Sequence, residues 1–235
     1  IWVTGEMGTG KTILSRVLVR LLEKEKVKYE IVVLVNPTLP TTEFVSDIIY
    51  QFGRPLPPPT TPKVELLHQL ENILYENVEK GEHNVILVDE AHTIVNEEVF
   101  EELRLMLNYQ KNEASLLTLV FLGQPELAKK IGRNKPLEQR LSLLYQLKPL
   151  SLEETMNYIL FRLEVAGLPV GQKMFTEESY GLIYKASGGV PRIINNLCDV
   201  CLLMGFSRKV QRVNEEIAAA VIEDIKKAED ILKGE

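Results

Sequence analysis

The sequence has few cysteines, no long apolar run and no excess of positive charge. Its 235 residues include two cysteines, which argues against a disulfide scaffold and fits a reducing cytosol. No apolar run approaches the roughly 18 residues that a membrane span needs. The net charge of −6 lacks the basic excess that supports strong nonspecific nucleic-acid binding. No row of aromatic residues suggests a base-stacking platform.

A glycine-rich motif of the form G-x-x-x-x-G-K-[ST] spans residues 5–12. Its glycines let backbone N–H groups turn inward around phosphate oxygens. The Lys11 ammonium can pair with the β- and γ-phosphates, and the Thr12 hydroxyl can ligate Mg²⁺. A β-prone segment precedes the motif and helical apolar spacing follows it, so a helix dipole adds to the anion site. The candidate nucleotide-binding residues here are Gly5, Glu6, Met7, Gly8, Thr9, Gly10, Lys11, Thr12 and Ile13.

Two carboxylates follow a second apolar segment. Residues 85–88 are all apolar, and Asp89 and Glu90 come directly after them. At the carboxyl end of a parallel strand, Asp89 could hold Mg²⁺ and Glu90 could orient and deprotonate the attacking water. A strand that runs into an acidic helix cap is the alternative explanation.

The chain alternates expected strands and helices as far as about residue 150 and is expected to be all helix afterwards. Strands are expected at 1–3, 29–35, 84–89, 116–122 and 143–147. Helices are expected after residue 12 and at 41–52, 62–80, 96–108, 151–167, 176–186, 191–206 and 214–232. Thr61 and Pro62 resemble an N-cap and first helical residue, and Ser151 with Glu154 matches a capping box. The pattern predicts an α/β domain over 1–150 and a helical domain over 151–235.

Five motifs occur in order and resemble one family. They are the glycine-rich loop, residues 89–92 (DEAH), 123–127 (GQPEL), 138–141 (EQRL) and 188–192 (GGVPR). Together they resemble the AAA+ ATPases of the general-secretion-pathway protein A type, whose relatives include transposition regulators. The resemblance covers residues 1–222. It implies a P-loop NTPase fold, which is a parallel five-stranded sheet in the order 51432, flanked by helices and followed by a small all-helical lid. It also implies ATP and Mg²⁺ as cofactors, with ATP bound between subunits of a homo-oligomer.

The resemblance assigns further site residues. Gln124 matches the position that senses the γ-phosphate, although a turn residue before Pro125 is an alternative. Arg140 matches the arginine finger that reaches a neighbouring subunit's ATP, with a helix C-terminal arginine as the alternative. Arg192 matches the lid residue that contacts the nucleotide. Asn36 matches a polar residue that restrains the catalytic glutamate, and turn chemistry explains it equally well.

Three other features have a structural alternative. Cys198 and Cys201 form a CxxC within an apolar helix, which favours packing in the lid core over zinc or redox chemistry. His92 is either a group behind the catalytic carboxylates or a helix cap. The basic cluster Lys129, Lys130, Arg133 and Lys135 is expected to be a solvated face, or else a subunit-interface or DNA-facing loop.

Only four residues precede Gly5, so we expect the upstream elements that help to hold adenine to lie outside this sequence. The favoured function is an ATP-hydrolysing motor or switch for a partner in secretion or cell-envelope machinery. One alternative is an ATP-dependent DNA-binding regulator of the transposition type, which the acidic charge disfavours, and another is a nucleotide-binding module without turnover. We expect a cytoplasmic protein, which a longer form could tether to a membrane.

Overall fold

The computed structural model describes residues 1–35, 37–111 and 113–233. Contacts between Cα atoms divide the chain into two units. The first comprises residues 1–7 and 11–147, and the second comprises residues 8–10 and 148–235. No helix of the described residues is both long enough and apolar enough to cross a membrane.

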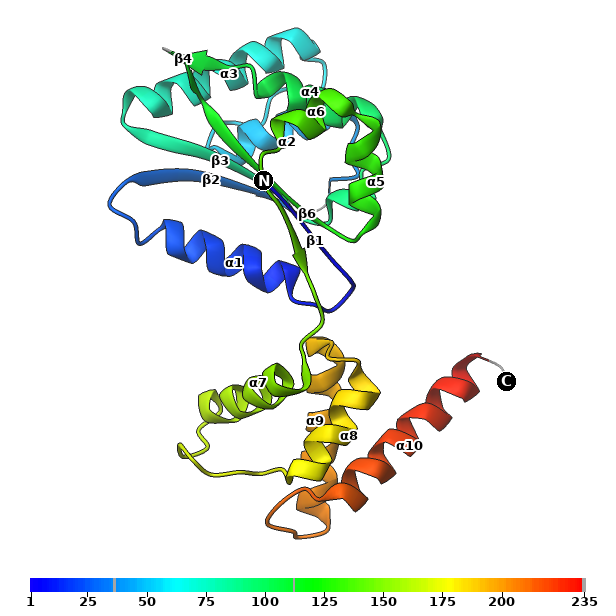
Figure 1. Cartoon of the computed structure of the whole chain (residues 1–235). Helices are drawn as coiled ribbons and strands as arrows, with labels where there is room; N and C mark the ends of the chain where they lie inside the picture. Colours follow the sequence, from blue (N-terminus) through cyan, green and yellow to red (C-terminus); the bar gives the residue numbers. More distant parts are fainter. Residues whose placement is uncertain (36, 112, 234–235) are drawn as a thin grey trace. The chain divides into compact units, whose positions relative to one another are not determined.

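The first unit is built on a five-stranded parallel sheet (Figure 1). Its strands are β1 (Trp2–Gly5), β2 (Lys28–Leu34), β3 (Glu82–Val88), β6 (Leu117–Gly123) and β7 (Leu144–Leu147). They lie in the order β2-β3-β6-β1-β7. Numbered by their order in the chain and counted from β7, the sheet strands give 5-1-4-3-2, which confirms the strand order expected from the resemblance.

Both faces of the sheet are covered, and the central strands are therefore apolar on both sides. On β3, Ile86 and Val88 join the larger core, whereas Val85 and Leu87 join a smaller one. The larger core receives apolar side chains from five helices, and the smaller core is closed by α1 (Lys11–Leu22). Figure 1 shows α1 alone on one face. The five helices are α2 (Thr41–Gln51), α3 (Lys63–Glu79), α4 (Glu97–Met106), α5 (Glu126–Arg133) and α6 (Lys135–Arg140).

The expected start of α3 was wrong by one residue. Thr61 was expected as the N-cap, but its N–H donates to the Pro58 carbonyl (2.9 Å), so Thr61 belongs to a turn. Pro62 has extended backbone angles (φ −59°, ψ 142°) and takes the N-cap position, and the helix begins at Lys63. Helices α5 and α6 and the small hairpin of β4 (Gln110–Lys111) with β5 (Ala114–Ser115) were not expected.

In the described part of the chain, the second unit contains four helices around its own core. They are α7 (Leu152–Val165), α8 (Glu177–Ser187), α9 (Pro191–Ser207) and α10 (Glu215–Lys233), within two residues of the expected ranges. The predicted capping box at the start of α7 is confirmed. The Glu154 N–H donates to Ser151 Oγ (3.3 Å), and the Ser151 N–H donates to the Glu154 carboxylate (2.8 Å).

Candidate nucleotide site

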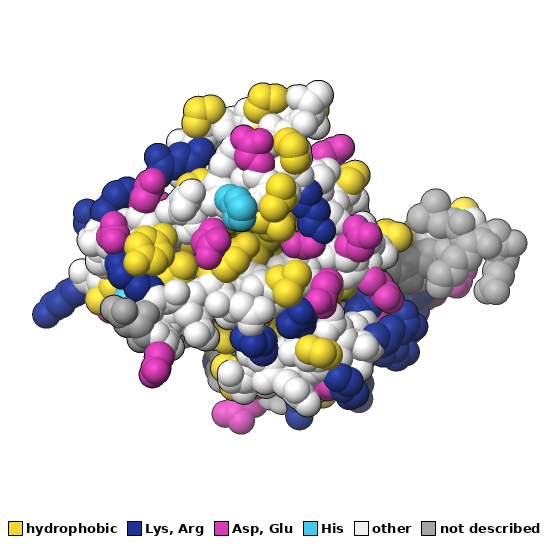
Figure 2. All heavy atoms as spheres, turned by 90° about the horizontal axis from the view of Figure 1, so that it is seen from above, with side chains coloured by type: hydrophobic (Ala, Val, Ile, Leu, Met, Phe, Trp, Pro, Cys, Tyr) yellow, Lys and Arg dark blue, Asp and Glu magenta, His cyan; other side chains and the backbone are white. Residues whose placement is uncertain are grey.

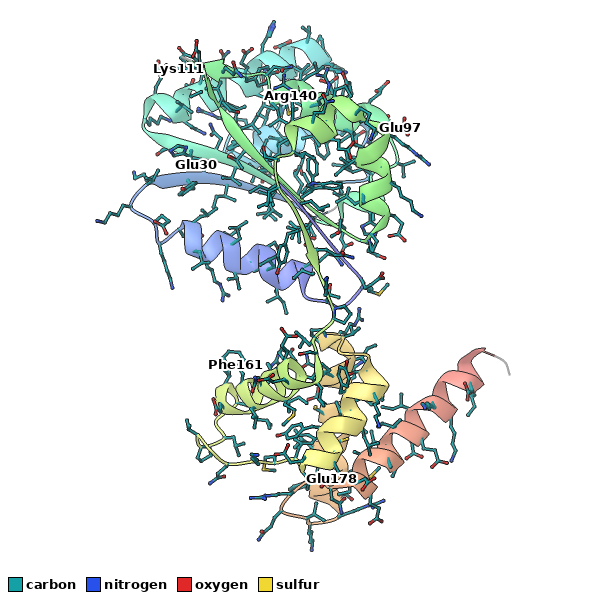
Figure 3. All side chains as sticks on the ribbon, in the orientation of Figure 1. Glu30, Glu97, Lys111, Arg140, Phe161 and Glu178 are labelled. Carbon is teal, nitrogen blue, oxygen red and sulfur yellow. The ribbon has the colours of Figure 1, made fainter. Side chains whose placement is uncertain are left out.

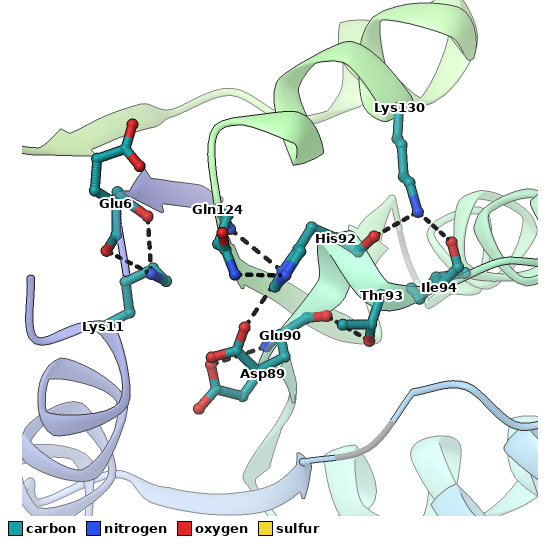
Figure 4. A network of polar contacts seen from close by, with 10 residues as sticks. Glu6, Lys11, Asp89, Glu90, His92, Thr93, Ile94, Gln124 and Lys130 are labelled. Atoms are coloured by element: carbon teal, nitrogen blue, oxygen red, sulfur yellow. Dashed lines mark hydrogen bonds and ion pairs between the residues drawn. The ribbon is translucent and has the colours of Figure 1, made fainter. Parts of the chain in front are cut away.

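The glycine-rich loop joins β1 to α1, and its last part is hydrogen-bonded to its first residues. Gly8 and Gly10 have φ angles of +83° and +103°, a left-handed backbone that favours glycine. Lys11 is the first residue of α1, and 5% of its surface is exposed. Its ammonium donates to the carbonyls of Gly5 (2.8 Å) and Glu6 (3.0 Å), as Figure 4 shows. These two acceptors offset the cost of burying the charge and hold the ammonium against the start of the loop.

Asp89 and Glu90 follow β3 directly. The Asp89 N–H continues the sheet ladder by donating to the Leu34 carbonyl (2.8 Å), and the side chain is buried. Asp89 Oδ1 accepts the Glu90 N–H (2.9 Å). Glu90 has φ +50°, a left-handed conformation that is uncommon outside glycine, and it starts the 3₁₀ turn η1 (Ala91–Thr93). Such backbone strain is frequent at functional sites.

Gln124 follows β6, next to His92 of η1. The Nε2 atoms of the two side chains lie 2.9 Å apart, and the Gln124 backbone N–H donates to His92 Nδ1 (3.3 Å). The same Nδ1 lies 3.3 Å from the Glu90 carboxylate. The structure therefore puts His92 behind the carboxylate and does not use its side chain as a helix cap. The sequence left these two roles open.

Parallel pairing brings these segments to one edge of the sheet. Thr4 of β1 is in register with Gly123 of β6, and Val88 of β3 is in register with Phe121. Because β6 lies between β1 and β3, the loop, the Asp89–Glu90 pair and Gln124 all follow the carboxyl ends of adjacent strands. That edge is where open α/β sheets bind their ligands.

Thr12 and Asp89 are the residues that could hold a magnesium ion. Both offer oxygen ligands, which Mg²⁺ prefers, and Mg²⁺ sites of this kind complete their coordination with water and substrate phosphates. Thr12 lies exposed in the first turn of α1, and Asp89 Oδ2 is the carboxylate oxygen not taken by the Glu90 N–H. Among the described residues, no group of three histidine, cysteine, aspartate or glutamate side chains forms a metal cluster.

Arg140 does not lie at this edge. It is the last residue of α6, shortly before the amino end of β7, and its side chain is exposed (Figure 3). Its Nη1 donates to the carbonyl of Leu107 at the end of α4 (3.4 Å). Arg192 is also exposed and lies in the first turn of α9, within the second unit. Its backbone N–H donates to the carbonyl of Gly8 (3.3 Å), a residue that belongs to the same unit. Asn36 lies outside the described residues.

The basic cluster is not a uniformly solvated face. The ammonium of Lys130 donates to the carbonyls of His92 and Ile94. Lys135 pairs with Glu138 (2.8 Å), and Arg133 lies 3.9 Å from Glu97. The expectation of a solvated side chain is therefore wrong for Lys130, because its charge satisfies carbonyls of η1. Positive and negative side chains are interspersed on the face in Figure 2, which looks down on the helices at the top of Figure 1.

Cys198 and Cys201 lie on the buried side of α9, which confirms the expected packing in the helical core. Both are free thiols. Burial raises the pKa of Cys198 to about 12, with Cys201 and Asp199 adding to the effect, and raises the pKa of Cys201 to about 11. Thiols with raised pKa values are poor nucleophiles and poor metal ligands near neutral pH.

The sequence is similar to those of known proteins. A family model described as an AAA domain matches residues 1–131. General secretion pathway protein A of Aeromonas hydrophila is 36% identical over 226 residues, which make up 95% of this chain and 40% of that protein. The chain thus spans less than half the length of this relative.

Solved structures with the same fold are more distant in sequence. The ORC2 protein of Aeropyrum pernix, in ADPNP–ADP complexes, is 14% identical with a TM-score of 0.68, over 94% of this chain and 61% of that one. Cdc6p of Pyrobaculum aerophilum is 18% identical with a TM-score of 0.68, over 90% and 57%. The RuvB Holliday junction branch migration motor of Thermotoga maritima is 19% identical with a TM-score of 0.58, over 94% and 60%. The AAA-domain match covers more than half of the sequence, and the chain belongs to the AAA+ ATPase family.

Proposed function

We propose that the chain binds MgATP at the carboxyl edge of its sheet and hydrolyses it where subunits of a homo-oligomer meet. The observation that carries this proposal is the convergence of three segments on that edge. Lys11 follows β1, the Asp89–Glu90 pair follows β3, and Gln124 follows β6. A phosphate-binding loop, an acidic pair and a polar sensor are the parts that nucleoside triphosphate hydrolysis needs.

Each residue has a distinct proposed role. The loop N–H groups and Lys11 hold the phosphates, with the helix dipole of α1 adding to the attraction. Thr12 and Asp89 hold Mg²⁺, which neutralises charge that develops on the phosphate oxygens. Glu90 orients the attacking water and accepts its proton. Gln124 contacts the γ-phosphate, and Arg192 contacts the nucleotide from the lid.

Arg140 is proposed to act on the ATP of a neighbouring subunit. Arg140 precedes the amino end of β7, whereas the proposed nucleotide site of the same chain follows the carboxyl ends of the strands. In this parallel sheet these are opposite edges. An exposed guanidinium in that position suits a role in trans. A planar guanidinium can bridge charge on the transferring phosphoryl group. The hydrogen bond to the Leu107 carbonyl fits the alternative, in which Arg140 is a structural arginine at a helix C-terminus. The variants described below distinguish the two roles.

The partner is proposed from the relative's name. Similarity to general secretion pathway protein A over nearly the whole chain favours a partner in secretion or cell-envelope machinery. A cytoplasmic location remains the expectation from the sequence. Duplex DNA is the less favoured partner, because three of the four cluster residues have carbonyl or carboxylate partners within the chain. A steep loss of DNA binding with salt would speak for the DNA alternative, since phosphate contacts release counterions.

The Glu90→Gln variant tests the proposal against nucleotide binding without turnover. We expect steady-state hydrolysis of MgATP by the wild-type chain and a loss of about 100-fold or more in kcat for Glu90→Gln, with binding retained. Glu97→Gln is the matched control, because it is an exposed glutamate of α4 and not one of the proposed site residues. A wild-type chain that binds MgATP tightly and shows no turnover as an oligomer would contradict the enzymatic function.

A further inference from the structure

One imidazole nitrogen of His92 faces two competing partners. His92 Nδ1 lies 3.3 Å from the Glu90 carboxylate and 3.3 Å from the backbone nitrogen of Gln124. It must carry a proton to donate to the carboxylate, and it must lack one to accept the Gln124 N–H. A single tautomer of a neutral imidazole can satisfy one of these two partners but not both.

The other ring nitrogen extends the competition to the Gln124 side chain. His92 Nε2 lies 2.9 Å from Gln124 Nε2. When Nδ1 carries the proton, Nε2 can accept from the Gln124 amide group. When Nε2 carries the proton, it needs an acceptor, and Gln124 can provide one by turning its carbonyl oxygen inward. The orientation of the Gln124 amide is therefore linked to whether the histidine holds the Glu90 carboxylate.

The surrounding backbone fixes the histidine in place. The Lys130 ammonium binds the carbonyls of His92 and Ile94, which anchors η1 to α5 (Figure 4). Gly123, which precedes Gln124, lies close to η1. A Cβ atom at Gly123 would be 3.2 Å from the backbone nitrogen of His92. The Thr93 hydroxyl donates to the Glu90 carbonyl (2.8 Å). Because the backbone of η1 is held on both sides, an exchange of hydrogen-bond partners involves movement of the side chains of Glu90, His92 and Gln124.

We propose that His92 is a positioning residue that couples Gln124 to Glu90. When the Gln124 amide turns toward a γ-phosphate, His92 exchanges its partner, and the Glu90 carboxylate is held or released accordingly. The catalytic base is thereby aligned according to what occupies the sensor position. This inference rests on the proposed hydrolysis of ATP, and it assigns no direct contact between His92 and the substrate.

The coupling makes a specific kinetic prediction. His92→Ala should lower kcat by about 10-fold or more, by analogy with the outer-shell groups that orient metal ligands, and leave the Kd for MgATP unchanged. His92→Asn keeps a hydrogen-bonding group near the Nδ1 position and should recover part of the loss. His92→Leu has similar bulk and no such group, so it should not. His68→Ala, at an exposed histidine on α3, is the matched control.

A double-mutant cycle with Gln124→Ala separates coupling from two independent effects. If His92 works through Gln124 and Glu90 as one unit, His92→Ala/Gln124→Ala should lose no more activity than the worse single variant. Melting temperatures of all variants show whether any loss of activity reflects unfolding. If His92→Ala does not fold, the same cycle is made with His92→Leu, which also removes the hydrogen-bonding group.

The outcomes are distinguishable. Reduced kcat at unchanged Kd, partial recovery by asparagine only, and a non-additive cycle support the inference. A folded His92→Ala variant with wild-type kcat, or a fully additive cycle, would overturn it while Lys11-dependent hydrolysis by the wild type still stands. A wild-type chain without Lys11-dependent hydrolysis would remove the proposed function and this inference together.

Discussion

The Lys11 ammonium donates a hydrogen bond to the carbonyl of Gly5, 2.8 Å away, so the last part of the loop folds back on its first residue. The Glu6 carbonyl is a second acceptor at 3.0 Å. The lysine is thus placed before any phosphate contact is made, and its buried ammonium can exchange carbonyl partners for phosphate oxygens. Pre-positioning of this kind lowers the ordering cost of binding.

Lys11→Ala should therefore weaken MgATP binding by about 30-fold or more, because truncating one member of a desolvated charge pair costs at least about 2 kcal/mol. Lys11→Met retains most of the aliphatic stem and should show the same loss, which would assign the effect to the charge. Titration with a fluorescent ATP analogue measures both. Binding within threefold of wild type in Lys11→Met would contradict the role of the ammonium.

Arg192→Ala should reduce the stabilisation that nucleotide confers and leave the nucleotide-free chain unchanged. The side chain is exposed in the first turn of α9, where a cation opposes the helix dipole, so burial and helix capping contribute little to its role. Melting temperatures with and without MgATP provide the test. A large drop without nucleotide, together with an unchanged response to MgATP, would make Arg192 a structural residue.

Asn84 should be important for stability. Its buried amide group donates to the carbonyls of Leu74 (2.9 Å) and Leu116 (2.8 Å), and its oxygen accepts from Asn77 (2.8 Å). Asn84→Ala removes these three buried hydrogen bonds and should lower the free energy of unfolding by about 2–4 kcal/mol. Asn72→Ala, at an exposed position on α3, should change it by less than about 0.5 kcal/mol. Chemical denaturation measures both, and equal effects would contradict the network's importance.

The two thiols should make stability depend on alkaline pH. Burial raises the pKa of Cys198 to about 12 and that of Cys201 to about 11, above the usual value of about 8.5. Above about pH 9 the unfolded chain releases these protons and the folded chain keeps them, so the free energy of unfolding falls as pH rises.

Cys198→Ala/Cys201→Ala should lose less stability between pH 7 and pH 10 than the wild type does, and the wild-type chain should contain no stoichiometric zinc. Denaturation at the two pH values and metal analysis check these points. Equal pH slopes in the two proteins would contradict the effect of burial on the thiols.

Local patterns predicted most of the architecture, because the main strands and helices carry their own periodicity. The apolar run from Val85 to Val88 and the capping box at Ser151 are examples that the structure confirms. Helices α5 and α6 escaped prediction because they are short and rich in polar residues. The hairpin of β4 and β5 has only two residues in each strand, which is too few for a periodic signal.

One part of the candidate site could be predicted from local sequence, and another part depends on the fold. The loop at residues 5–12 and the Asp89–Glu90 pair are contiguous in the chain and could be recognised directly. The contact between His92 and Gln124 joins residues 32 apart, and the bonds from Lys130 to η1 span 36 and 38 residues. Such contacts depend on strand order and on the close approach of Gly123 to η1, which no local pattern encodes.

Mixing two inactive variants shows whether ATP is hydrolysed at an interface shared by two subunits. Arg140→Ala should bind MgATP and hydrolyse it slowly, since an arginine finger contributes about 10³–10⁵ in rate in analogous systems. Lys11→Ala has a broken pocket and an intact Arg140. Some interfaces in the mixture should then combine an intact pocket with an intact arginine.

The measurement is the MgATP hydrolysis rate of Lys11→Ala mixed with Arg140→Ala, over a range of ratios and total concentrations. We predict that activity reappears on mixing and rises with protein concentration, as assembly follows mass action. Lys11→Ala mixed with Glu90→Gln is the control and should stay inactive, because both changes break the pocket. A Lys11→Ala/Arg140→Ala mixture that forms hetero-oligomers and remains inactive at every ratio would contradict hydrolysis at a shared interface.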